Sequence, residues 1–264
     1  MAKGGRETPP DLQALRAVFD AVRAGTLDPA EAERQAVDGL RLDPLENLGF
    51  ARVDHHRADR QGFPEVIFGQ GKTPSQIAGI ARAIVERGHS LLVTRTDTTA
   101  YDAVAKVVPD ARFHEQARII ERRTHVPRGQ GVVLIAAAGT SDIPVAEEAA
   151  ISAEVMGNDV DRLYDVGVAG LHRLLSERHR LEAARVVIAV AGMEAALPSV
   201  LGGLVDRPLI AVPTSIGYGV SIDGLVALGA MLSSYTPGIT IINIDNGVNA
   251  AVTATKITHL TVTP

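Results

Sequence analysis

The chain has 264 residues, 46% of them hydrophobic and 22% charged, and a net charge of −5 at pH 7. This is the composition of a globular protein, and an acidic balance without a long basic run argues against a nucleic-acid partner. The absence of cysteine excludes disulfides, thiolate metal sites and a cysteine nucleophile. Because no apolar run approaches the ~20 residues of a membrane span and the start lacks a signal-like stretch, we expect a cytoplasmic protein with no membrane partner.

The first forty residues are predicted to form a helical segment. Apolar residues recur at helical spacing over 12–22, and Asp28-Pro29 opens a second stretch that runs towards Leu40. We expect residues 1–40 to form a helical pair that contacts another subunit.

Residues 41–125 are predicted to form a small α/β domain. Strands are expected at 51–54, 65–68 and 90–94, with further strand within 111–122, and helices from Thr73-Pro74 onward and over 97–108. The segment 127–131, which contains proline and two glycines, is expected to link this domain to the next.

Residues 126–264 show a regular alternation of strand-like and helix-like segments. Strands are expected at 132–137, 163–165, 185–191, 208–213 and 239–244, separated by helices at 145–156, 169–181, 194–205 and 217–234. Such alternation implies right-handed βαβ units and an α/β fold with a doubly wound parallel sheet. Ligands of these sheets lie beyond the carboxyl ends of the strands, which is where chemistry is expected.

The first of these strands is followed by Gly139, Thr140, Ser141 and Asp142, directly before a helix with Pro144 in its first turn. Free amides and the positive end of the helix dipole at such a position suit a phosphate group. The alternative is that Ser141 or Asp142 only caps the helix.

The four other strand ends also carry glycine with hydroxyl, amide or carboxylate groups. They supply Asp165, Gly167, His172 and Arg173 after the second strand, Gly192 and Glu194 after the third, Thr214, Ser215 and Tyr218 after the fourth, and Asp245 and Asn246 after the fifth. Each has a plain alternative, since a surface His-Arg pair is usually solvated and an Asp-Asn-Gly sequence often forms only a turn. Five polar strand ends together predict a phosphate-accepting site.

In this order, the segments resemble the LarB family of nickel-pincer cofactor biosynthesis and, more distantly, the PurE-type AIR carboxylases and mutases. The matching stretches are 139–149, 165–175, 191–203, 210–219 and 243–247, together with 52–57 and 62–69 in the N-terminal half. The likeness covers about residues 41–247 and favours LarB, because PurE proteins lack the N-terminal part. It implies a PurE-like, flavodoxin-like fold and a homo-octamer.

The resemblance also implies a reaction. LarB carboxylates the pyridinium ring of nicotinic acid adenine dinucleotide at C5 and hydrolyses its phosphoanhydride, which yields pyridinium-3,5-biscarboxylic acid mononucleotide and AMP. The co-substrate is CO2 or bicarbonate, and no tightly bound organic cofactor is expected. Mg2+ on phosphate oxygens and carboxylates is the one credible metal.

Site residues follow from the resemblance by position. Thr140, Ser141 and Asp142 fall on the motif that holds the substrate ribose phosphate. His172 and Arg173 fall on a pair near substrate and CO2, and Glu194 is a candidate for proton or Mg2+ handling. Asp142 and His172 are catalytic candidates together with Glu194.

The N-terminal half contributes further candidates. Asp54, His55 and Arg57 lie in a matching stretch and are expected to reach the nucleotide, with a structural role as the alternative. His55 and His56 would point apart on a strand, so they are not expected to share a metal. A second phosphate clamp is expected from among Lys72, Arg95, Arg118, Arg122 and Arg123.

The chain departs from the LarB pattern in one chemically important place. LarB proteins carry a cysteine shortly before the last strand, and Tyr235 stands at that position. The residues that follow Asn246-Gly247 also differ from those usual in LarB proteins. A pyridinium ring is electron-poor, so a nucleophile must add before its C5 attacks CO2, and a thiolate suits this step better than a phenol with a pKa near ~10.

Three functions therefore remain open. The protein carboxylates or decarboxylates an electron-rich heterocyclic nucleotide, or a pyridine nucleotide by a cysteine-free route in which Tyr235 is a catalytic candidate. Alternatively it retains only the hydrolysis of a dinucleotide. The last possibility is a non-catalytic relative that binds pyridine nucleotides.

Overall fold

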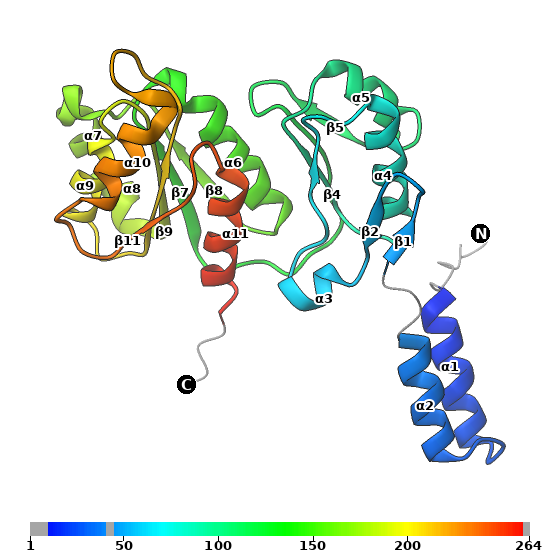
Figure 1. Ribbon diagram of the computed structural model, residues 1–264. Coiled ribbons are helices and arrows are strands. Elements are labelled where there is room, and N and C mark those ends of the chain that lie inside the picture. Colours follow the sequence, from blue (N-terminus) through cyan, green and yellow to red (C-terminus); the bar gives the residue numbers. More distant parts are fainter. Residues whose placement is uncertain (1–9, 41–44, 261–264) are drawn as a thin grey trace, which may run out of the picture.

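The computed structural model describes residues 10–40 and 45–260. Helices α1 (Pro10–Arg23) and α2 (Pro29–Leu40) form an antiparallel pair that stands apart from the other elements (Figure 1). Asp28 starts α2 because its carboxylate accepts a hydrogen bond from the Ala30 amide at 2.9 Å. Both predicted helices are thus present, and the subunit contact expected of them stays a prediction.

The small domain is built on a four-stranded sheet in the order β3-β4-β6-β5, in which only β3 and β4 run parallel. Its elements are β1 (Leu45–Asn47), β2 (Arg52–Asp54), α3 (Arg57–Gln61), β3 (Ile67–Phe68), α4 (Pro74–Glu86), β4 (Leu91–Thr94), α5 (Thr98–Ala105), β5 (Arg112–His114) and β6 (Ile119–Arg122). Thr73 and Gln76 form a capping box that begins α4. The segment 111–122, expected as strand, is a hairpin of β5 and β6 with a turn between them.

The C-terminal domain is a five-stranded, all-parallel sheet in the order β11-β10-β9-β7-β8. Its strands are β7 (Val132–Ala137), β8 (Asp159–Leu163), β9 (Ala184–Ala191), β10 (Leu209–Pro213) and β11 (Ile239–Ile241). Its helices are η1 (Thr140–Asp142), α6 (Ile143–Val155), η2 (Val168–Gly170), α7 (Leu171–Ser176), α8 (Arg178–Ala183), α9 (Ala196–Gly202), η3 (Ile222–Gly224), α10 (Leu225–Leu232) and α11 (Gly247–Thr258). This strand order is flavodoxin-like, as expected.

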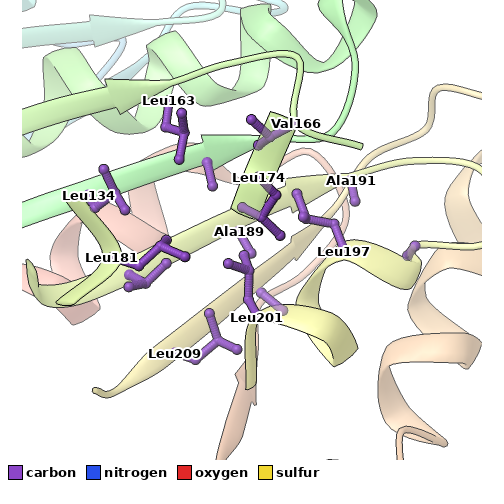
Figure 2. Packing of buried hydrophobic residues seen from close by; sticks show 14 of the residues in the cluster. Leu134, Leu163, Val166, Leu174, Leu181, Ala189, Ala191, Leu197, Leu201 and Leu209 are labelled. Carbon is purple, nitrogen blue, oxygen red and sulfur yellow. The ribbon is translucent and has the colours of Figure 1, made fainter. Parts of the chain in front are cut away.

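Helices cover both faces of this sheet (Figure 1). Aliphatic side chains from the strands interdigitate with those of α7, α8 and α9 on one face (Figure 2), among them Leu134, Leu174, Leu181, Leu197 and Leu201. On the other face, alanines of α6 and α11 lie against valines and isoleucines of β7 and β9. Burial on both faces explains the nearly continuous apolar strands.

Several predicted boundaries were wrong for physical reasons. The strand expected at 163–165 lies at 159–163, since β8 is an edge strand with polar residues such as Asp161. The helix expected over 169–181 breaks at Glu177, and the one over 217–234 begins at Leu225 after a loop. Helix α11 was not predicted, although Asn246 caps it.

An apolar cluster joins the small domain to the C-terminal domain. Phe63, Leu92 and Ile119 pack against Ile151 and Val155 of α6. This contact places the small domain beside α6 and α11 (Figure 1). In the described part of the chain, no helix has the length and apolar character needed to span a membrane.

Candidate functional site

A cavity of about 530 Å³ opens at the carboxyl ends of the C-terminal strands. Strand β8 lies on one side of β7 and β9 on the other, so the loops after β7 and β9 diverge and leave a crevice. The cavity is lined by Ala138, Gly139, Ser141 and Asp142 after β7, by Asp165, Gly167, Val168, Ala169 and Arg173 after β8, by residues 191–197 at and after the end of β9, and by Ile216, Gly217 and Tyr218 after β10. Four of the five predicted strand ends therefore meet in one site.

Asp142 is buried at the base of the first loop, where it shapes the backbone. One carboxylate oxygen accepts the Gly139 amide at 2.9 Å, and the other accepts the Thr214 hydroxyl at 2.7 Å. Burial raises the pKa of Asp142, against the opposing effect of these hydrogen bonds. Because both oxygens are engaged, Asp142 holds the loops after β7 and β10 together and leaves Thr140 and Ser141 exposed beside the cavity.

Glycines bring backbone close together around the cavity. A Cβ at Gly167 would lie 2.7 Å from the Ala138 carbonyl oxygen, and one at Gly192 would lie 2.3 Å from that of Ile216. No side chain fits at either position without displacement of the neighbouring loop.

The loop after β9 presents Glu194 in an unusual backbone setting. Met193 and Ala195, on either side of it, adopt positive φ angles of 53° and 50°. Such angles are uncommon for residues other than glycine and cluster at functional sites. Glu194 is exposed at the cavity and has no ion-pair partner among the described residues.

Arg173 of α7 supplies positive charge at the opposite wall. Its guanidinium forms an ion pair with Asp165, which lies in the loop after β8 and has a positive φ of 58°. His172 is exposed and does not line the cavity, so only Arg173 of the predicted pair reaches it within one chain.

The loop after β11 supports the site without lining the cavity. The Asp245 carboxylate accepts the Ser215 amide at 2.8 Å, and the Asn246 side chain accepts the Asn249 amide at 2.9 Å to cap α11. These two residues therefore fix the loop after β10 and the start of α11.

Comparison with known proteins agrees with this architecture. A family model described as LarB/PurE-like N-terminal domain matches residues 45–124, and a model described as AIR carboxylase matches residues 132–263. The chain belongs to the LarB family. That family is related to PurE, and the matched domains point to an enzymatic role of the carboxylase and mutase type.

Relatives of this LarB-family chain fall into two groups. An uncharacterized protein of Methanocaldococcus jannaschii is 38% identical over 258 residues, which is 93% of this chain and 98% of that protein. An N5-carboxyaminoimidazole ribonucleotide mutase of the same organism is 37% identical over 136 residues, which is 49% of this chain and 80% of the mutase. A mutase of the same name from Pyrococcus abyssi is 34% identical over 125 residues, which is 44% of this chain and 67% of that protein.

Three candidates from the N-terminal half of the LarB-family chain lie outside the cavity. Asp54 pairs with Arg60 at 2.5 Å, and buried His55 lies 2.8 Å from the carboxylate of Glu46. The Arg57 guanidinium lies over a phenylalanine ring. The expectation that His55 and His56 lie on a strand was wrong, since both are in the turn after β2.

Tyr235, at the LarB cysteine position, is also remote from the cavity. It is fully exposed in the loop between α10 and β11. That loop enters the amino end of β11, whereas the cavity lies at the carboxyl ends of its parallel neighbours. Within one chain, the structure does not bring Tyr235 to the predicted site.

One buried carboxylate, that of Glu148, was not predicted from the sequence. Glu148 of α6 accepts hydrogen bonds from the Thr94 hydroxyl of the small domain and from the Gly247 amide at 2.9 Å. Burial raises its pKa, and Arg95 opposes that shift. The alanines at 146, 149 and 150 are the feature of the sequence that indicates a buried helix at this position.

Proposed function

We propose that this LarB-family chain is a nucleotide carboxylase that binds its substrate in the cavity at the ends of β7, β8, β9 and β10. The reaction to be tested first converts nicotinic acid adenine dinucleotide, CO2 and water to pyridinium-3,5-biscarboxylic acid mononucleotide and AMP. The observation that carries the proposal is the convergence of a glycine loop, Arg173 and Glu194 on one cavity in an AIR carboxylase domain.

The loop after β7 is suited to the ribose phosphate. Asp142 holds its backbone, and Thr140 and Ser141 remain exposed as hydroxyl donors next to the start of α6. Backbone amides at a helix start attract anions. Arg173 adds a positive charge that favours the binding of a carboxylate or CO2-derived group.

Glu194 is the residue that we propose handles the proton. The ring must supply an electron pair to CO2: an aminoimidazole does so directly, and a pyridinium does so only after a nucleophile has added to it. The C–C bond forms from that pair, and the proton on the carbon, followed by any added nucleophile, must leave to restore aromaticity. An exposed carboxylate at the cavity, free of any ion pair in the described part of the chain, is able to accept it.

Mg2+ would accompany the substrate. Within residues 10–40 and 45–260, no three His, Asp or Glu side chains gather as a metal site. Glu194 is a single carboxylate, so the remaining ligands would be phosphate oxygens and water, as is common for this ion. The ion would supply charge neutralisation at the phosphoanhydride.

A carboxylase of an electron-rich heterocycle is the second candidate. The lack of cysteine favours it, because an aminoimidazole ring is already an enamine and attacks CO2 without a covalent adduct. The likeness to N5-carboxyaminoimidazole ribonucleotide mutases supports the same candidate.

The test is incubation with 13C-bicarbonate and Mg2+, in parallel with nicotinic acid adenine dinucleotide and with aminoimidazole ribonucleotide, read by mass spectrometry. Label in a dicarboxylated pyridine mononucleotide, with AMP, supports the first candidate. Label in the imidazole product supports the second, and AMP without label indicates hydrolysis alone. No turnover of either compound contradicts the proposal and leaves a binding role.

A pair of variants ties the activity to the cavity. Glu194→Gln should lower label incorporation about 10²- to 10⁴-fold, the usual scale for a general base. Glu182→Gln removes the same charge from an exposed position on α8, where Glu182 pairs with Arg178, and should leave incorporation unchanged.

We also propose a homo-octamer, as the LarB resemblance implies. Exposed apolar side chains beside the cavity mouth support self-association, in particular Tyr218, Val220 and Ile222. Light scattering of the purified chain at micromolar concentration tests this, and a monomer would contradict it.

A further inference from the structure

Three basic side chains gather at the edge of the small-domain sheet that faces the start of α11. Lys72, Arg95 and Arg118 come from the loop after β3, the end of β4 and the turn before β6. Lys72 and Arg118 have no carboxylate within 4.0 Å in the described part of the chain, and the nearest one to Arg95 is Glu148 at 4.0 Å. We call this cluster, with Thr96, the basic edge.

The aromatic ring of Phe68 organises two of these cations. The Lys72 ammonium lies 6.0 Å from the ring centroid and donates a hydrogen bond to the Phe68 carbonyl at 2.7 Å. The Arg95 guanidinium lies 5.9 Å from the same centroid. Cation–π contacts of this kind hold two like charges near each other while both remain able to bind an anion.

The backbone of the basic edge is strained where its arginines lie. Arg95 has a φ of 52° and Arg118 a φ of 54°. Gly69 packs so closely that an added Cβ would lie 2.9 Å from the Thr94 carbonyl oxygen. Arg118 closes the turn between β5 and β6, where its amide donates to the Glu115 carbonyl at 3.1 Å, and Arg95 directly follows β4.

An unpartnered hydroxyl lies inside the basic edge. Thr96 is 5% exposed, and its Oγ1 has no hydrogen-bond partner among the described residues. Its carbonyl accepts a hydrogen bond from Arg118, and its Cβ would lie 3.2 Å from a Cβ at Gly69. A buried hydroxyl without a partner is costly, so an acceptor such as a phosphate oxygen would satisfy it.

The basic edge is linked to the cavity by a short chain of hydrogen bonds. Arg95 donates to the carbonyl oxygen of Asp245, whose carboxylate accepts the Ser215 amide at 2.8 Å. The neighbouring Thr214 donates to Asp142 at the cavity. Both regions therefore lie at the carboxyl end of the parallel sheet.

We propose that the basic edge is a second anion site that binds the phosphate group of a nucleotide. Three cations, an orphaned hydroxyl and a close-packed glycine loop match the charge and acceptor oxygens of phosphate. The phosphate comes either from the far half of a dinucleotide whose other half fills the cavity, or from a separate nucleotide.

The first experiment is calorimetric titration of the full chain with AMP and with inorganic phosphate. Lys72→Gln and Arg118→Gln should each weaken AMP binding about 10- to 100-fold, the range for one charge-assisted hydrogen bond. Lys106→Gln, which removes an exposed lysine at the end of α5, should leave it unchanged. Thr96→Val should weaken AMP binding without a loss of folding stability.

If wild-type chain binds neither AMP nor phosphate at millimolar concentration, or if Lys72→Gln, Arg118→Gln and Lys106→Gln behave alike, the basic edge is not a phosphate site. This readout needs no turnover, so the proposed carboxylase activity stands or fails separately.

Competition distinguishes the two sources. If one dinucleotide spans both sites, nicotinic acid adenine dinucleotide should displace AMP and nicotinic acid mononucleotide together, at one dinucleotide per chain. If the phosphate belongs to a separate nucleotide, AMP should bind at full stoichiometry to chain that is saturated with dinucleotide. Either result supports an anion site at the basic edge.

Discussion

The hydroxyl of Thr214 donates a 2.7 Å hydrogen bond to the carboxylate of Asp142, although 72 residues separate them. Both groups are buried, and the bond joins the end of β10 to the loop that begins α6. The same carboxylate accepts the Gly139 amide. One side chain therefore sets the distance between two walls of the cavity.

The first prediction concerns this pair. Thr214→Val and Asp142→Asn should each lower the free energy of unfolding by about 1–3 kcal/mol, because each leaves a buried polar group unsatisfied. In the double variant the losses should be less than additive, since the same bond is lost only once. Urea denaturation of the four proteins measures this, and strict additivity would show that the bond contributes nothing.

The second prediction concerns Glu148 and pH. Burial raises its pKa above the ordinary value of 4.5, so the folded chain holds this proton more tightly than the unfolded chain. The stability that depends on Glu148 is fully present below pH 4.5 and is lost as the pH rises through the raised pKa. Glu148→Gln should remove this loss.

The measurement is the difference in unfolding free energy between wild type and Glu148→Gln across the mildly acidic to neutral range. The difference should change with pH in favour of the variant, by no more than about 1.4 kcal/mol per pH unit. The pKa of Asp142 is also raised by burial, but that group is common to both proteins and cancels. Parallel curves would mean that Glu148 titrates normally.

The third prediction compares two glycines. Gly192→Ala should lower the free energy of unfolding by about 1–3 kcal/mol and weaken nucleotide binding, because the new Cβ would lie 2.3 Å from the Ile216 carbonyl oxygen. Gly229→Ala, in α10, meets no atom within 4 Å and should raise that free energy by up to ~1 kcal/mol. Equal effects of the two substitutions would contradict the close approach at Gly192.

The fourth prediction concerns Tyr235. The side chain of Tyr235 is fully exposed and lies outside the cavity. Tyr235→Phe should therefore leave label incorporation unchanged and should change the free energy of unfolding by no more than ~0.5 kcal/mol. Tyr164→Phe is the matched change at a half-buried tyrosine, whose hydroxyl donates to Glu147 at 2.8 Å. Tyr164→Phe should lower the free energy of unfolding by about 1 kcal/mol. Loss of label in Tyr235→Phe alone would instead make Tyr235 catalytic.

Several features could be predicted because their causes are local. The start of α4 at Thr73-Pro74, the buried runs of β7 and β9, and the glycines after each parallel strand all follow from nearby residues. Helix α11 was missed although Asn246 caps it, since its alanines and threonines give a weak amphipathic pattern.

The amino-acid sequence by itself determined the parallel α/β class, the LarB resemblance and the expectation of a polar site at the strand ends. Only the tertiary structure decided that Gly139, Gly192 and Tyr218 share one cavity while Tyr235 lies elsewhere. It also decided that Glu148 is buried between domains and that Arg95 meets Asp245, 150 residues away. The physical reason is that periodicity and caps depend on neighbours in the chain, whereas strand order and domain packing depend on which apolar faces bury each other.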